Sequence, residues 1–141
     1  AYGTRFGADA VVNAREEDAV AAVKRLTGGL GADLVIEASG GMDTPQQCVE
    51  MVKRGGKLLF LAFYKAPVTF DLSRAIREDV TLYTTRGEGN GSVRRALAMA
   101  KQGLLHGGEL VTHRFALDDI QEGFRIVRER EGDPIKAVFV P

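Results

Sequence analysis

The sequence KLLFLAF at residues 57–63 is a near-continuous apolar run, and DLVIEA at residues 33–38 is a second run of the same type. Such runs are typical of strands that are covered on both faces of a parallel sheet. Apolar residues at helical spacing predict a helix between the two runs, with Thr44 as its N-cap and Gly55 as its stop. A strand, a helix and a strand in this order predict a βαβ unit.

The same alternation continues on both sides of this unit. Further strands are predicted at 9–13, 80–85, 110–115 and 135–140, and further helices at 16–26, 93–104 and 117–127, the last with Asp118 as its cap. Strands that alternate with helices predict an α/β fold with a doubly wound, Rossmann-type parallel sheet. In such sheets ligands bind beyond the carboxyl ends of the strands, so the residues after each strand form the candidate site.

Composition narrows the classes of protein that this chain could represent. The 141 residues carry 19 basic and 19 acidic side chains, a balance that argues against a generally basic nucleic-acid binder. The longest strongly apolar run, residues 58–64, is far too short to cross a bilayer, so we expect no membrane partner. Cys48 is the only cysteine, which excludes an internal disulfide framework and is consistent with a reducing cytoplasm.

Five blocks of sequence, in their order and spacing, resemble the medium-chain, zinc-dependent alcohol and polyol dehydrogenases. The blocks are RFGADAVVN (5–13), TGGLGADLVIEASGG (27–41), RGGKLLFLAF (54–63), LVTHRFALDDIQEGF (110–124) and IKAVFVP (135–141). In that family the dinucleotide fingerprint, the acidic residue that reads the adenosine ribose and the catalytic-zinc ligands precede the position that Arg5 matches. Since the chain also starts without methionine, at Ala1, we expect it to be the C-terminal portion of such an enzyme, inactive alone.

The resemblance implies two parts of the chain and a gap in the sheet. Residues 1–87 would be the C-terminal part of the dinucleotide-binding domain, and residues 88–141 an α+β segment that returns to the catalytic domain. In the strand order 3-2-1-4-5-6, the strands at Val11 and Leu34 would be the third and fourth, with the first two strands missing between them. Either the full enzyme surrounds this segment, another chain fills the gap, or the Val11 strand shifts. The family also implies a homo-oligomer, a dimer or tetramer, with a dimer-forming strand near residues 80–85.

Two glycine clusters could be mistaken for phosphate-binding loops. Neither Gly29–Gly31 nor Gly87–Gly89 continues as G-x-G-x-x-G, and neither is followed by the Gly-Lys-Ser/Thr of a P-loop. We interpret both as turns that need a positive φ.

Small residues follow the strand at 33–38. Ala38, Ser39 and Gly40 would let a flat ring or a backbone approach closely, or would simply form a tight strand-to-helix turn. The resemblance implies that the adenosine half of the cofactor lies against them. Lys136, at the start of the last strand, matches a basic position that reaches the cofactor pyrophosphate in the family; without the resemblance, a solvated surface lysine is the alternative.

The next two strand ends match the segments that hold the nicotinamide. The resemblance implies that Leu61, Ala62 and Phe63 lie beside the nicotinamide ring and that Thr85, Arg86 and Gly87 meet its carboxamide from the other side. Ordinary sheet core is the alternative for these positions. Phe63 and Tyr64 depart from the small or Val/Pro residues that the family often has here, which leaves the shape of this loop open.

No residue is assigned to catalysis or to a metal. A catalytic zinc needs three protein ligands, and the two histidines, His106 and His113, do not cluster with other ligands in the sequence. We interpret His113 as a structural hydrogen-bonding residue and Cys48 as an inert buried thiol. Zinc would therefore belong to the full-length enzyme, with no ligands in this segment.

The function implied by the resemblance is an NAD- or NADP-dependent oxidoreductase that transfers hydride between a small alcohol or polyol and nicotinamide. The residue that would discriminate NAD from NADP lies upstream in the family. Two alternatives stay open: a zinc-free quinone or enone reductase of the same superfamily, and a non-catalytic module that binds a nucleotide or a protein.

Overall fold

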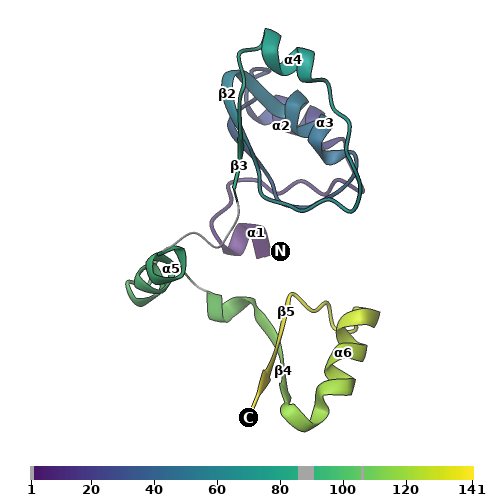
Figure 1. The fold of residues 1–141 in the computed structure, drawn as a ribbon, viewed down its shortest axis with the longest axis vertical. Coiled ribbons are helices and arrows are strands. Elements are labelled where there is room, and N and C mark those ends of the chain that lie inside the picture. Colours follow the sequence, from purple (N-terminus) through teal and green to yellow (C-terminus); the bar gives the residue numbers. More distant parts are fainter. Residues whose placement is uncertain (1, 86–90, 106) are drawn as a thin grey trace. The chain divides into compact units, whose positions relative to one another are not determined.

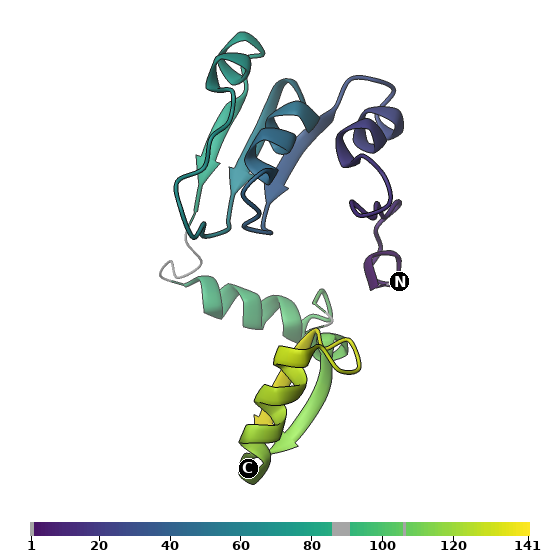
Figure 2. The same cartoon turned by 90° about the vertical axis from the view of Figure 1, so that its right-hand side faces the viewer.

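The structure of this chain, a computed structural model, describes residues 2–85, 91–105 and 107–141. The chain divides into two compact units, residues 1–86 and 87–141, whose elements are shown in Figures 1 and 2. No helix among the described residues has the length and apolar character that crossing a membrane requires.

The first unit contains a three-stranded parallel sheet in the order β1-β2-β3. Its strands are β1 (Ala32–Glu37), β2 (Val52–Phe60) and β3 (Thr81–Thr84). Leu58 of β2 pairs with Val35 of β1 on one side and with Leu82 of β3 on the other. The predicted α/β class and parallel sheet are therefore confirmed, and the strand order is the one expected for the fourth, fifth and sixth strands.

The core of this unit lies on one face of the sheet. The helices are α1 (Tyr2–Arg5), α2 (Ala19–Leu26), α3 (Thr44–Met51) and α4 (Leu72–Arg77). Helix α3 packs against β1 and β2 and also against α2 (Figure 2). Cys48 and Val49 of α3 are buried with Leu58 of β2 and Ala75 of α4, and the side chains of Val35 and Leu82 pack against this cluster.

The opposite face of the sheet is exposed in the part of the chain that the structure describes. Leu34 and Ile36 of β1 are each 50% exposed, and Tyr83 of β3 is 46% exposed. The prediction that the apolar runs are covered on both faces is wrong for β1 within the described residues. An apolar run shows that a strand favours cover, but it does not supply the element that would cover it.

The strand predicted at residues 9–13 does not form. This segment is irregular, Val11 is 55% exposed, and β1 pairs only with β2 among the described residues. The backbone hydrogen bonds at its end are local, with the amides of Glu16 and Glu17 donating to the carbonyl of Asn13 at 2.9 and 3.1 Å. Two adjacent valines favour an extended chain, but a strand also needs a neighbouring strand to pair with.

Helix α3 lies where it was predicted, but both of its boundary residues behave differently. The Thr44 hydroxyl does not cap the helix but lies within hydrogen-bond distance of two acceptors, the carbonyl of Gly41 at 2.8 Å and Oε1 of Glu37 at 2.9 Å, and the N-cap residue is Asp43. The helix ends at Met51, so Gly55 is not its stop. Gly55 lies inside β2 with φ +69° because the strand carries a bulge there.

The bulge in β2 is long. Ala32 pairs with Val52 and Leu34 pairs with Lys57, so two steps along β1 match five along β2. A Cβ on Gly56 would lie 2.7 Å from Cγ2 of Val52 and 2.8 Å from the carbonyl of Lys53, so the tight path requires glycine.

The second unit is a βαβ unit preceded by a helix. Its elements are α5 (Ser92–Lys101), η1 (Gly107–Leu110), β4 (Val111–Ala116), η2 (Leu117–Asp119), α6 (Ile120–Glu129) and β5 (Lys136–Val140). β4 and β5 pair in parallel and α6 packs against them (Figure 1). The Phe139 ring lies 5.7 Å from that of Phe115 and 5.9 Å from that of Phe124. Asp118 does not cap α6, because it lies within the preceding 3₁₀ turn.

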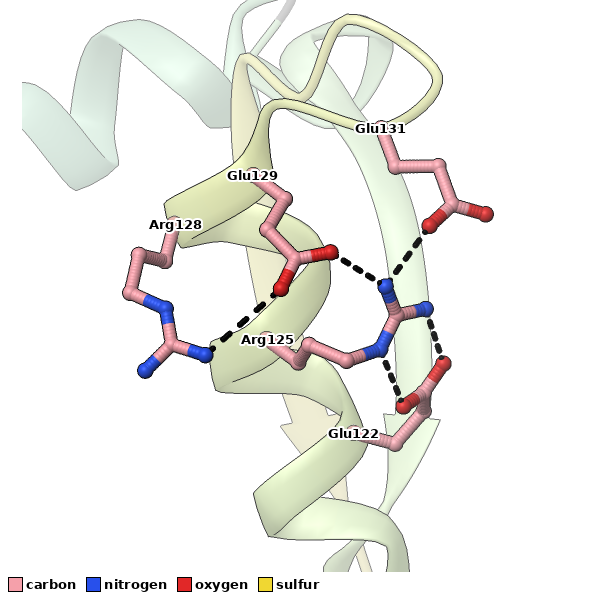
Figure 3. Close-up of polar contacts among 5 residues, drawn as sticks. All are labelled: Glu122, Arg125, Arg128, Glu129 and Glu131. Carbon is pink, nitrogen blue, oxygen red and sulfur yellow. Dashed lines mark hydrogen bonds and ion pairs between the residues drawn. The ribbon is translucent and has the colours of Figure 1, made fainter.

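Arg125 organises the outer face of α6, as Figure 3 shows. Its guanidinium donates to Glu122 at 2.6 and 2.7 Å and to Glu129 at 2.7 Å, and it lies 2.9 Å from the carboxylate of Glu131. The hydrogen bond to Glu122 and those to the other two carboxylates raise the pKa of Arg125 above its already high ordinary value. Glu131 follows Arg130, whose φ is +56°, so this cluster ties the end of the helix to the turn beyond it.

Candidate cofactor site at the carboxyl ends of the strands

The three parallel strands of the first unit end at one edge of the sheet. The Leu61 amide, just after β2, donates to the carbonyl of Glu37 at the end of β1, at 2.8 Å. The Thr85 amide, just after β3, donates to the carbonyl of Phe60 at 3.4 Å. Neighbouring strand ends are therefore joined by backbone hydrogen bonds, and the segments predicted to face a cofactor lie along one edge.

A pocket of about 480 Å³ lies at the ends of β2 and β3. It is lined by Phe60, Leu61, Ala62, Phe63, Tyr64, Val68, Phe70, Thr84 and Thr85. Four of the predicted site residues, Leu61, Ala62, Phe63 and Thr85, are thus brought together around one cavity. The volume and the mainly apolar and aromatic lining are typical of a small-molecule site.

The other predicted residues have different positions. Ala38, Ser39 and Gly40 form the turn after β1 and do not line the pocket. Arg86 and Gly87 lie outside the described residues. Lys136 is the exposed first residue of β5 in the second unit, and its contact with a cofactor stays a prediction.

The turn after β1 touches the loop after β2 at Gly40. This glycine has φ +70°, and a Cβ built on it would lie 3.0 Å from the carbonyl oxygen of Phe63. A residue with a side chain would be strained by its backbone conformation and would press on the pocket loop, residues 61–64 after β2. The close approach explains why a glycine follows Ser39.

Glu37, the last residue of β1, is buried, with 2% of its surface exposed. Its Oε1 atom accepts hydrogen bonds from the Ser39 amide at 2.9 Å, the Ser39 hydroxyl at 2.6 Å, the Gly40 amide at 3.1 Å and the Thr44 hydroxyl at 2.9 Å. Its Oε2 atom accepts a hydrogen bond from the Tyr64 hydroxyl at 2.5 Å. The carboxylate therefore has donors on both of its oxygens.

These donors determine the charge of the site. Burial alone would raise the pKa of Glu37, but the hydrogen bonds from Ser39, Tyr64 and Thr44 outweigh it and hold the pKa at about 2. Burial, together with this negative charge, raises the pKa of the Cys48 thiol to about 11. Glu37 is thus ionised at neutral pH and Cys48 is a protonated thiol, as expected for an inert cysteine.

Glu37 was not among the predicted site residues. One signal for it was present in the sequence: a carboxylate at the end of an apolar run, with Ser39 and Gly40 two and three residues later, whose amides lie within its reach. Tyr64, 27 residues further on, gives no such local signal.

The described residues do not fit a zinc ion. They contain no group of three or more His, Cys, Asp or Glu side chains placed to hold a metal. His113 lies in the second unit with Nδ1 2.9 Å from the Thr112 hydroxyl and its ring stacked on Phe115. His106 lies outside the described residues.

Comparison with known proteins adds family information to this geometry. Residues 1–102 match the family model described as zinc-binding dehydrogenase. The chain is 34% identical over 140 residues to an alcohol dehydrogenase of Cupriavidus necator, covering 97% of this chain and 38% of that protein. It is 31% identical over 138 residues to an erythritol/L-threitol dehydrogenase of Mycolicibacterium smegmatis, with the same two shares covered.

The fold of this chain also resembles those of solved dehydrogenase structures. An Escherichia coli oxidoreductase of unknown specificity superimposes with a TM-score of 0.89 at 28% identity, covering 98% of this chain and 39% of that one. Benzyl alcohol dehydrogenase from Acinetobacter calcoaceticus has a TM-score of 0.84 at 22% identity, covering 98% and 38%, a likeness of fold. The chain thus spans about two-fifths of the length of these relatives.

Proposed function

The chain belongs to the zinc-binding dehydrogenase family, and from that premise we propose that its residues serve an NAD(P)-dependent enzyme that transfers hydride between an alcohol or polyol and nicotinamide. The names of its relatives, alcohol dehydrogenase and erythritol/L-threitol dehydrogenase, support this substrate class. The observation that carries the proposal is the pocket at the ends of β2 and β3, which four predicted nicotinamide-facing residues line.

In this proposal the chain binds and orients the cofactor. The nicotinamide, when bound, supplies the carbon that accepts or donates hydride. Leu61, Ala62 and Phe63 form one apolar wall for its ring, and Thr85 offers its backbone carbonyl to its carboxamide. The turn of Ala38–Gly40 faces the adenosine half. These segments exclude water from the ring and fix which of its faces is open to the substrate.

Three further parts of the proposal concern the whole protein. Residues 1–87 belong to the dinucleotide-binding domain and residues 88–141 to a segment that returns to the catalytic domain, a division that the two compact units support. Lys136 offsets the charge of the cofactor pyrophosphate. The enzyme is a homo-oligomer. It is cytoplasmic, a location that the single, unpaired cysteine of this chain supports. Zinc belongs to the full-length enzyme in this proposal, and the role proposed for the described residues, which contain no group of three or more potential metal ligands, is cofactor binding.

Cofactor binding is tested by titrating the protein with NADH and with NADPH while following the fluorescence of the reduced nicotinamide. Ala62→Phe fills the pocket, and we expect it to weaken binding at least tenfold. Ala21→Phe adds the same ring at an exposed position of α2 and should leave the affinity unchanged. Saturable binding of neither cofactor, or equal affinities in Ala62→Phe and the wild type, would overturn the assignment of this pocket.

Hydride transfer is tested on the polypeptide isolated from its source, after its intact mass has been measured. We expect it to reduce NAD+ or NADP+ in the presence of at least one member of a panel of small alcohols and polyols. A preparation that binds the cofactor but reduces it with none of them would retain the binding site and overturn the dehydrogenase assignment.

A further inference from the structure

The two oxygens of the Glu37 carboxylate serve two different segments of the site. The donors to Oε1 come from Ser39, Gly40 and Thr44, which belong to the turn after β1 and the first residue of α3. The donor to Oε2 is the Tyr64 hydroxyl, which comes from the loop after β2. One buried side chain therefore connects two segments that α3 and β2 separate along the chain.

The backbone reinforces the same connection. The carbonyl of Glu37 accepts from the amides of Leu61 and Ala62 at 2.8 and 3.3 Å, and Gly40 approaches the carbonyl of Phe63. These contacts fix the start of the pocket loop. Tyr64 fixes the next position of the loop, because its hydroxyl is held by Glu37 while the residue also lines the pocket.

The hydroxyl of Tyr64 cannot be exchanged without effect on this arrangement. A short O–H···O⁻ hydrogen bond to a buried carboxylate is among the stronger hydrogen bonds in proteins. Tyr64 is the one partner of Oε2 found among the described residues, so its removal leaves a buried charged oxygen unpaired. The loop would relax to relieve that cost, and the pocket wall would move with it.

We infer that Glu37 and Tyr64 are positioning residues that lock the nicotinamide-facing wall of the pocket to the turn that faces the adenosine half. The inference rests on the proposed function, because it assigns the two halves of the cofactor to the two segments. Both halves of a dinucleotide then bind one preorganised surface, and the binding free energy is not reduced by the entropy cost of ordering the loop. The Tyr64 hydroxyl acts on the nicotinamide half alone.

The test compares two ligands that differ only by the nicotinamide, NADH and ADP-ribose, on the same protein. For a protein that prefers NADPH, the pair is NADPH and 2′-phospho-ADP-ribose. Tyr64→Phe removes one oxygen atom. We expect it to weaken NADH binding roughly tenfold, the effect of losing one hydrogen bond to a charged group, and to change ADP-ribose binding less than twofold.

Two further variants make the result specific. Tyr83→Phe is the matched control, because Tyr83 is 46% exposed on the other face of the same sheet, and it should bind both ligands like the wild type. Thr44→Val removes a donor from Oε1, on the turn side, and should weaken both ligands together. The thermal unfolding midpoint of each variant reports whether the fold is kept.

The ratio of the two affinities decides the outcome. A loss of NADH affinity alone in Tyr64→Phe supports the lock, that is, the positioning of the pocket wall by the contact between Glu37 and Tyr64. Equal losses for NADH and ADP-ribose, or no loss for either, would overturn it while leaving the proposed function intact. A wild-type protein that binds neither NADH nor NADPH would instead overturn the proposed function, and the lock with it.

Discussion

At the scale of single residues, Glu37 is both buried and ionised. A carboxylate with 2% of its surface exposed loses most of its contact with water, and the protein replaces that contact with hydrogen bonds from Ser39, Gly40, Thr44 and Tyr64. The folded state stabilises the ionised form of Glu37 more than the unfolded chain does. The charge of this one residue is therefore linked to folding.

That linkage predicts how stability depends on pH. The pKa of Glu37 is about 2 in the folded state against 4.5 ordinarily, so its contribution to the free energy of unfolding is fully present above about pH 4.5. It is lost as the pH falls toward the folded-state value. The difference in pKa corresponds to a contribution on the order of 3 kcal/mol. Urea unfolding at a series of pH values measures it.

The matched variants for this experiment are Glu37→Gln and Asp9→Asn. Glu37→Gln cannot ionise and leaves buried donors poorly matched, so it should be less stable at neutral pH and should lose less stability on acidification. Asp9 is exposed, and Asp9→Asn should follow the wild-type curve. The same acid dependence in Glu37→Gln and the wild type would contradict the assignment of this titration to Glu37.

At the scale of elements, α6 shows how one cation can hold a helix end. Arg125 meets Glu122 and Glu129 along the helix and Glu131 beyond it (Figure 3). Its side chain is 35% exposed, so solvent and salt screen these contacts only in part. The pairs at spacings of three and four residues support the helix, and the contact to Glu131 supports the turn.

Arg125→Ala should therefore loosen the end of α6 and the turn that follows it. We expect faster amide hydrogen exchange in the last turn of α6, a lower thermal unfolding midpoint, and a smaller decrease of that midpoint with added salt than in the wild type. Arg128→Ala is the control, because the contact of Arg128 to Glu129 is longer, at 3.6 Å. Equal exchange rates in the two variants would show that the Arg125 cluster does not hold the helix end.

The elements also show what a sequence can reveal. The run at residues 57–63 predicted β2 because an apolar strand core is a local signal, although the strand ends at Phe60. The prediction of a strand at Val11 was wrong because a strand needs a neighbouring strand to pair with, and the local sequence does not show whether one is present. Thr44 was wrongly predicted as the cap because the helix begins one residue earlier than its capping-box pattern indicates, with Thr44 as its first residue and Asp43 as its N-cap. The contact between Glu37 and Tyr64 depends on strand register and has no counterpart in residue spacing.

At the scale of the whole molecule, burial is uneven between the two faces of the first sheet. One face carries the buried cluster around Leu58, while Leu34 and Ile36 on the other are half exposed. Among the described residues, the outer edge of β1 also has no strand beside it. Exposed apolar side chains next to an unpaired strand edge favour association between copies of a chain.

The 141-residue chain should therefore self-associate at high concentration. We expect its sedimentation coefficient to rise with protein concentration, and the double substitution Leu34→Glu with Ile36→Glu to reduce that rise by placing charge on the exposed face. Leu30→Glu adds the same charge at a 73% exposed loop position and serves as the control. A concentration dependence that the double substitution leaves unchanged would place the association elsewhere on the chain.

The bulge at the start of β2 has a consequence for how such a chain tolerates insertions and deletions. Between Val52 and Lys57 the strand already accommodates more residues than its neighbour, and from Lys57 to Phe60 its pairing with β1 is continuous. A change in chain length within the bulge would be absorbed before the regular ladder begins. The carboxyl ends, where Glu37 meets the pocket loop, would keep their register. We therefore expect changes in chain length at this end of the sheet to leave the geometry at the other end unchanged.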